Sequence, residues 1–167
     1  MDADAKKTAL RMIPYGIYIL TAEAGDGSVA AATVNWVTQT AFAPPLVAVA
    51  IKADSGAYAV VKKAGGFTLN MLGKGQQGAA FTFFKPAEKK DGTLSGEPYR
   101  AGATGQPVLR NAAAAVECKV AEIVARGDHH VVLAEVVEAH VMKPPAGRAD
   151  AAILEMKELG EKVFYGG

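Results

Sequence analysis

Two long segments rich in β-branched residues, joined by a tight turn, constrain the fold of this chain more than any other feature. The first covers residues 114–125, the turn is Arg126-Gly127-Asp128, and the second covers residues 129–142. Glycine and aspartate in a short connection between two such segments are typical of a β-hairpin. We therefore predict a long antiparallel hairpin in the second half of the chain.

Shorter strands and helices are predicted before this hairpin. β-Branched and aromatic residues favour two strands around a turn at Gly25-Asp26-Gly27 and two further strands later. Ser55 is placed to cap a short helix that ends at Gly65-Gly66, and a second short helix ends in phenylalanines. The expected strands cover residues 15–22, 28–36, 46–51 and 67–72, and the expected helices cover residues 55–64 and 76–84.

The other segments are expected to be less regular. Residues 85–107 are polar and rich in glycine and proline, which predicts a loop of about twenty residues, longer than most connections. Residues 149–159 have weak helical character, and either the loop or the VFYGG sequence at residues 163–167 could control ligand access. Many strands, few short helices and long hairpins together predict a mainly β fold, an antiparallel barrel.

Composition and charge narrow the class of protein. The chain has 167 residues, half of them hydrophobic, with 18 basic and 17 acidic side chains, which indicates a single domain over residues 1–167. A net charge of +1 gives no electrostatic footprint for nucleic acid. The first residues lack the apolar run of a signal peptide, and no run reaches the roughly 18 residues that span a bilayer. We therefore expect a cytoplasmic protein without a membrane partner.

The cysteine and histidine positions argue against disulfides and metal centres. One cysteine cannot form an internal disulfide, and Cys118 alternates with valines as a small buried residue would. His130 and His140 would lie roughly 33 Å apart in one extended strand, too far to share a metal ion. Motifs of zinc hydrolases, serine hydrolases, P-loop proteins and Rossmann dinucleotide-binding domains are also absent.

A polar segment between two apolar strands, within residues 30–51, is the strongest candidate for a binding site. Pro44-Pro45 then defines where the next strand begins. Short hydrogen-bonding side chains on an irregular backbone predict that a polar ligand is held here. These side chains are Thr33, Asn35, Thr38, Gln39 and Thr40.

Six landmarks in order relate the chain to a known family. They are TVNWVTQ, PPLVAVAI, a helix that begins with serine, GFTLNML, GQPVL, and GDHHVVLAEV. Over nearly its whole length the chain resembles the flavin-reductase-like family, FMN-binding proteins built on a split β-barrel. The resemblance implies an antiparallel split barrel with a few short peripheral helices, and a homodimer with flavin at the subunit interface.

The resemblance also implies how FMN would be held. The phosphate is expected at Lys52 and Ser55, where a lysine precedes a helix N-terminus. The edge of the flavin ring would meet residues 33–38, with Asn35 and Thr38 as the leading side chains. The implied FMN-binding residues are Thr33, Val34, Asn35, Trp36, Val37, Thr38, Ala50, Ile51, Lys52, Ser55, Tyr58, Phe81, Thr82 and Lys85.

Purely structural roles stay open for several of these residues. Ser55 could do no more than cap its helix, and Lys52 could be only a surface charge. Thr33 and Thr40 could be present because threonine favours strands. Phe81 could belong to the core.

His129, in the sequence Gly-Asp-His at the hairpin turn, is the one candidate for a side chain that touches the reaction. In the reductases that the chain resembles, this histidine lies near the nicotinamide or the flavin, where it could bind the nicotinamide amide or balance charge. The alternative is that Asp128 and His129 only shape the turn. His130 points to the other face of its strand and is expected to be structural.

Trp36 departs from the family pattern, in which a small residue, often serine, stands at this place. A tryptophan here could stack near the flavin ring or narrow the space for nicotinamide. It could also be a core or interface residue, a common role for this side chain.

The leading functional hypothesis is an NAD(P)H:flavin oxidoreductase, with FMN as cofactor and NADH or NADPH as transient electron donor. The protein would supply position and a water-poor pocket, and reduced flavin would pass electrons onward, for example to a monooxygenase. One alternative, favoured by Trp36, is an FMN-binding electron-transfer protein reduced by a protein partner. Another is a binding protein that holds a different planar ligand. Exposed side chains of Phe81, Phe83 and Phe84 are expected to form the interface of a twofold-symmetric dimer.

Overall fold

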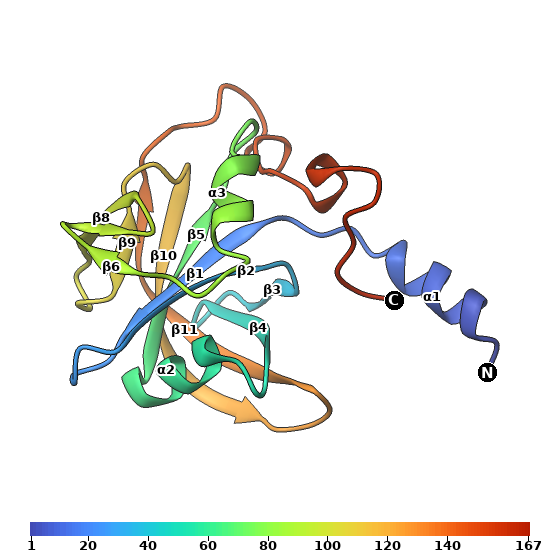
Figure 1. Cartoon of the computed structure of the whole chain (residues 1–167), viewed down its shortest axis with the longest axis horizontal. Coiled ribbons are helices and arrows are strands. Elements are labelled where there is room, and N and C mark those ends of the chain that lie inside the picture. Colours follow the sequence, from blue (N-terminus) through green and yellow to red (C-terminus); the bar gives the residue numbers. More distant parts are fainter.

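The protein is built around one strongly curled antiparallel sheet. The computed structural model describes residues 1–167, and Figure 1 shows the strands wrapping around a common interior. The sheet has seven strands in the order β2-β1-β5-β10-β11-β4-β3. Their bounds are β1 Tyr18–Glu23, β2 Val29–Val34, β3 Val37–Ala41, β4 Leu46–Lys52, β5 Gly66–Met71, β10 Ala114–Val124 and β11 His129–Val141.

The two outermost strands of this sheet follow one another along the chain. Only Asn35 and Trp36 separate β2, at one edge, from β3, at the other. Because each extended residue spans at most about 3.6 Å, two residues cannot bridge a flat sheet of seven strands. The sheet must therefore curl until its edges approach each other at Asn35 and Trp36. The predicted fold class, a mainly β antiparallel split barrel, is confirmed.

Both predicted hairpins are present. β10 and β11 pair along almost their entire length, with two register shifts, and β1 pairs with β2 across a turn in which Gly27 has a φ of 84°. β5 joins the hairpins because it pairs with both β1 and β10. Gly66 is required in β5, since a Cβ atom there would lie 2.8 Å from the carbonyl oxygen of Cys118.

Hydrophobic residues form one core inside the barrel and another outside it. The inner core includes Leu69, Cys118 and Val132, and it is closed at one end by helix α2, Gly56–Ala64. Burial raises the pKa of Cys118 to about 12, so the thiol behaves as the small apolar residue that its sequence pattern predicts. The outer core lies against helix α3, Gln77–Thr82, and its largest members are Ile17, Ile19, Leu72, Phe83, Leu94, Leu109 and Leu154.

The segment predicted as a long loop, residues 85–107, instead forms a small second sheet. Its strands are β6 Lys89–Lys90, β7 Thr93–Leu94, β8 Glu97–Ala101 and β9 Pro107–Leu109. Tight turns at Asp91-Gly92 and Ser95-Gly96, all four residues with positive φ, connect strands too short to produce a visible alternation. The prediction of a loop was therefore wrong.

Two elements were not expected from the sequence. Helix α1, Ala3–Arg11, is capped by Asp2 and has no buried residue; Figure 1 shows it projecting from the barrel. Strand β3 runs along the sheet edge with its polar side chains exposed, where an irregular ligand-binding segment was predicted. The weak helical character of residues 149–159 corresponds to two 3₁₀ turns, Ala149–Ala151 and Met156–Leu159. None of the helices combines the length and hydrophobicity needed to cross a bilayer.

Candidate functional site

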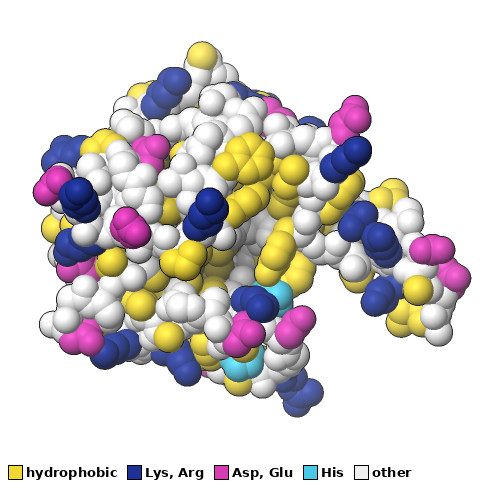
Figure 2. Space-filling view, in the orientation of Figure 1, with side chains coloured by type: hydrophobic (Ala, Val, Ile, Leu, Met, Phe, Trp, Pro, Cys, Tyr) yellow, Lys and Arg dark blue, Asp and Glu magenta, His cyan; other side chains and the backbone are white.

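A cavity of about 430 Å³ opens at the end of the barrel where its two edges meet. Figure 2 shows a hollow with largely hydrophobic walls and a histidine side chain at its rim. The lining comes from β2, β4, the start of α2, the residues after α3, the start of β11 and the last part of the chain. The lining residues are Ala32, Thr33, Val34, Asn35, Ala50, Ile51, Lys52, Ser55, Ala57, Phe83, Phe84, His129, Met156, Val163, Phe164 and Tyr165.

Many of the residues implied as flavin-binding converge on this cavity from separate elements. They come from the β2–β3 edge, from the end of β4, from the cap of α2 and from the β10–β11 turn. This convergence follows from the pairing of His129 with Lys52 in neighbouring strands β11 and β4. The implied residues found in the lining are Thr33, Val34, Asn35, Ala50, Ile51, Lys52, Ser55 and His129.

Other implied residues lie outside the wall of this cavity. The Thr38 side chain is exposed on β3 and bonds to the Gln39 carbonyl, and Val37 lies on the same strand. Tyr58 is buried in the inner core, where its hydroxyl contacts His130 Nδ1 at 2.7 Å. Trp36 packs behind His129. The implied residues absent from the lining are Trp36, Val37, Thr38, Tyr58, Phe81, Thr82 and Lys85.

The phenylalanines at the end of α3 and just after it do not all lie where they were expected. Phe83 and Phe84 line the cavity, whereas Phe81, which was expected there, does not. Phe83 is also 2% exposed and belongs to the outer core, so the expectation of an exposed Phe83 was wrong. Thr33 is tied to this region because its hydroxyl donates to the Ala80 carbonyl at 2.7 Å.

The N-terminus of α2 forms a cationic corner of the cavity. The Ser55 hydroxyl accepts from the Tyr58 N–H at 3.1 Å and donates to the Lys52 carbonyl at 2.7 Å, so it is fully used as a helix cap. The N–H groups of Gly56 and Ala57 remain without helical partners, as in any first helical turn. Lys52 Nζ lies 3.1 Å from an Asp54 carboxylate oxygen, and both side chains are more than half exposed. The corner thus offers backbone donors and a mobile ammonium group to an anion.

His129 lies at the rim beside this corner, where three neighbours hold it. Its Nδ1 lies 2.9 Å from Asp128 Oδ1 and its Nε2 lies 2.7 Å from the Tyr165 hydroxyl. Since a carboxylate only accepts, Nδ1 carries the hydrogen of the neutral ring and Nε2 accepts from Tyr165. The Trp36 ring lies 4.6 Å from the imidazole, centroid to centroid, and leaves the His129 side chain 13% exposed.

The last residues of the chain cross this rim. The Asn35 amide donates to the Tyr165 carbonyl at 3.1 Å, and the Tyr165 ring lies 5.5 Å from that of Trp36. Met156, Val163 and Phe164 complete the wall, although no local pattern marks them as site residues. The only signal in the sequence is the aromatic pair before two glycines, which does not say where the segment goes.

Comparison with known proteins places this architecture in a family. The family model described as the flavin reductase like domain matches residues 10–153. The chain belongs to this family.

Several flavin reductases resemble the chain in sequence and structure. It is 36% identical over 124 residues to the reductase component of the 4-nitrophenol 4-monooxygenase/4-nitrocatechol 2-monooxygenase of Rhodococcus opacus, covering 74% of this chain and 64% of that protein. It is 30% identical over 141 residues to a flavin reductase of Pseudomonas putida, and the match covers 84% of this chain and 81% of that protein. The structure of the styrene monooxygenase flavin reductase of Pseudomonas putida S12 matches with a TM-score of 0.71 and 28% identity. The match covers 86% of this chain and 89% of that one.

Proposed function

We propose that this protein is an NAD(P)H:flavin oxidoreductase that binds FMN. The observation that carries the proposal is the cavity, in which a cationic corner at Lys52 lies beside His129 and most of the remaining wall is apolar. Its volume of about 430 Å³ lies in the range of sites that hold compact organic ligands. Flavin supplies the redox chemistry when bound, because it accepts a hydride from the nicotinamide.

The residues of the site fit the parts of FMN. Lys52 and the free N–H groups of Gly56 and Ala57 would hold the phosphate, for which charge and helix-terminal donors are suited. Ala50 and Ile51 in the wall exclude water from the ring. Asn35 is the amide side chain available for the polar edge of the ring. His129 would orient the nicotinamide amide through Nε2, the acceptor nitrogen that contacts the Tyr165 hydroxyl in this structure.

The proposal is tested by anaerobic reduction. The purified protein is loaded with FMN, NADH and then NADPH is added, and the loss of flavin absorbance is followed in time. We expect rapid bleaching with at least one nucleotide, slowed by His129→Ala. His130→Gln is the control, because this neighbouring histidine bonds to Tyr58 on the core side. Undiminished bleaching in His129→Ala would show that this histidine is not needed.

An electron-transfer protein reduced by a protein partner is the second candidate. The packing of Trp36 against His129 favours it, because the indole fills space beside the only candidate for a nicotinamide contact. In this case the FMN-loaded protein would remain yellow with both nucleotides.

We further propose that the reduced flavin serves a monooxygenase and that the protein acts as a homodimer. Two of the relatives are named as monooxygenase reductases, which supports the first point. The homodimer is supported by the exposed rings of Phe81 and Phe84, whose centroids lie 5.4 Å apart beside the cavity.

A further inference from the structure

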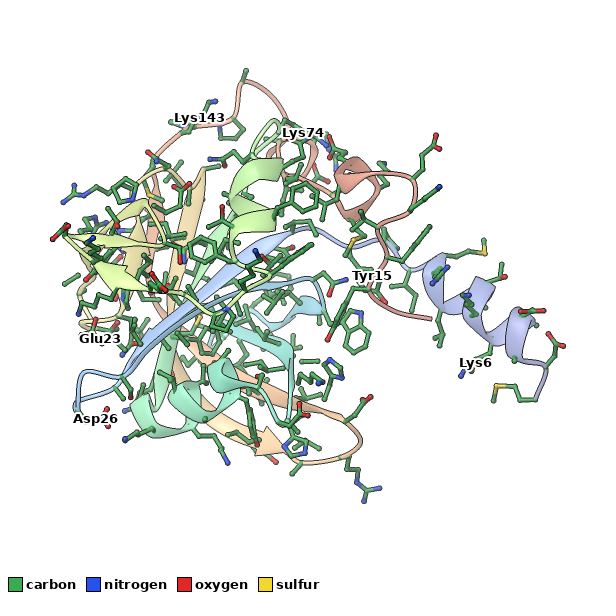
Figure 3. All side chains as sticks on the ribbon, in the orientation of Figure 1. Lys6, Tyr15, Glu23, Asp26, Lys74 and Lys143 are labelled. Atoms are coloured by element: carbon green, nitrogen blue, oxygen red, sulfur yellow. The ribbon has the colours of Figure 1, made fainter.

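Residues 163–167 run across the mouth of the cavity rather than away from the protein. Figure 3 shows this part of the chain passing close to Tyr15, and a Cβ atom on Gly166 would lie 3.8 Å from that ring. On the other side of this segment lies a second cavity, of about 520 Å³, and Phe164 and Tyr165 line both cavities. The segment is therefore the partition between two hollows.

The segment is attached to the site by specific polar contacts. The Tyr165 carbonyl accepts from Asn35, and its hydroxyl donates to His129 Nε2. Burial raises the pKa of Tyr165, so at neutral pH the hydroxyl keeps the proton that it donates. Arg11 adds a bond from Nε to the Gly166 carbonyl at 3.3 Å and lies over the Phe164 ring.

The two glycines permit this path. Gly166 has a φ of 132° and Gly167 a φ of 97°, conformations that residues with side chains rarely adopt. A Cβ atom on Gly167 would lie 2.9 Å from the Lys7 carbonyl oxygen. The sequence Tyr-Gly-Gly therefore delivers the tyrosine to His129 with the backbone pressed against Trp36 and helix α1.

The contacts that hold residues 163–167 are nevertheless weak enough for the segment to be displaced. Phe164 and Tyr165 remain 52% and 48% exposed, and the segment belongs to no strand or helix. The contacts that hold Tyr165 at the rim are two hydrogen bonds and the packing of its ring beside Trp36 and His129.

We propose that Tyr165 occupies the position on His129 that the nicotinamide amide requires, so that the electron donor binds only by displacing it. Tyr165 thus weakens binding of the nicotinamide nucleotide through its hydrogen bond to His129. This inference rests on the proposed function, because it takes His129 as the nicotinamide contact. One hydrogen bond that competes in this way lowers the apparent affinity by about 2- to 10-fold.

The test compares wild type, Tyr165→Phe and Tyr165→Ala in equilibrium binding. NAD⁺ is titrated by calorimetry into the FMN-loaded protein, which requires no reaction, and FMN binding is measured separately by quenching of Trp36, the single tryptophan. We expect Tyr165→Phe to bind NAD⁺ about 2- to 10-fold more tightly and Tyr165→Ala at least as tightly, with unchanged FMN affinity. Tyr99→Phe, on β8 of the small sheet, is the control.

Three results would overturn the inference: NAD⁺ affinity that is unchanged or weaker in both variants, a loss of FMN affinity, or no NAD⁺ binding to any form. A loss of FMN affinity would assign Tyr165 to the flavin site instead. If NAD⁺ binds more tightly to the variants but neither NADH nor NADPH reduces the flavin, the displacement holds and the proposed reductase activity fails. The two failures are therefore distinguishable.

Discussion

At the scale of single residues, Glu117 is the most unusual side chain outside the site, because its carboxylate is completely buried. It accepts hydrogen bonds from the N–H groups of Ala103 and Thr104, from the Thr104 hydroxyl and from His140 Nε2, at 2.5–2.9 Å. Arg100 contacts the other imidazole nitrogen at 3.1 Å. These bonds join the turn before β9 to the central hairpin.

The free energy of unfolding should depend on pH, because Glu117 becomes protonated in acid. Burial alone would raise its pKa, but the hydrogen bonds from Thr104, His140 and Ala103 outweigh it and lower the pKa from 4.5 to about 2. A carboxylate with a lowered folded-state pKa stabilises the fold above pH 4.5, and this stabilisation is lost as the pH falls toward 2.

We therefore expect Glu117→Gln to reduce the free energy of unfolding at pH 7 by about 1–3 kcal/mol, since it leaves buried donors without an acceptor. The difference from wild type should shrink between pH 4.5 and pH 2. Urea denaturation at pH 7 and at pH 2 measures the difference in the free energy of unfolding, and Glu122→Gln at an exposed position is the control. A difference that is the same at pH 7 and pH 2 would contradict the assigned pKa.

At the scale of elements, the N-terminus of α2 has a structural role as a capped helix end, and we propose a binding role for it as well. The Ser55 hydroxyl caps the helix, and this leaves the phosphate to the backbone donors and to Lys52. The two roles are separable because they belong to different side chains.

We expect Lys52→Gln to weaken FMN binding by roughly 5- to 30-fold in Kd, while riboflavin binding is unchanged. Riboflavin lacks the phosphate and so reports on the ring site alone. Fluorescence titration of both ligands measures the difference, and Lys119→Gln on β10, an exposed lysine, is the control. An equal loss of affinity for FMN and for riboflavin would place Lys52 near the flavin ring instead.

Ser55→Ala should act on the helix rather than on the ligand. The loss of the cap is expected to reduce the free energy of unfolding by about 0.5–2 kcal/mol. Thermal or urea denaturation without ligand measures this change. Unaltered stability would mean that the cap contributes nothing in this helix.

At the scale of the whole molecule, the exposed phenylalanines next to the cavity are expected to be buried between two copies of the chain. Phe81 and Phe84 are 43% and 55% exposed, and Phe84 also lines the cavity. A partner at this surface would therefore complete the flavin site.

Sedimentation equilibrium of the 17.3 kDa chain should give twice the monomer mass. The double variant Phe81→Glu, Phe84→Glu should sediment as a monomer and bind FMN more weakly. Val124→Glu changes an equally exposed valine on β10 and should remain dimeric. A wild-type monomer, or a double variant that stays dimeric, would exclude this interface.

Features that depend on residues close together in the chain could be predicted from the sequence. Strand alternation, turn glycines and the serine cap depend on contacts within a few residues, so both hairpins, α2 and the family landmarks could be read directly. The two-residue strands of the 85–107 segment and the isolated helix α1 were missed because their local signals are too short or have no buried face.

Which of the candidate residues share a cavity depends on the closure of the whole sheet. Curling of the sheet turns Thr38 outward on an edge strand while it brings Asn35 to the rim. Tyr165 meets Asn35 and His129, which are 130 and 36 residues away along the chain. Contacts of this kind depend on how the whole sheet closes and leave no periodic signal in the sequence, which is why the role of the last residues became visible only in the folded protein.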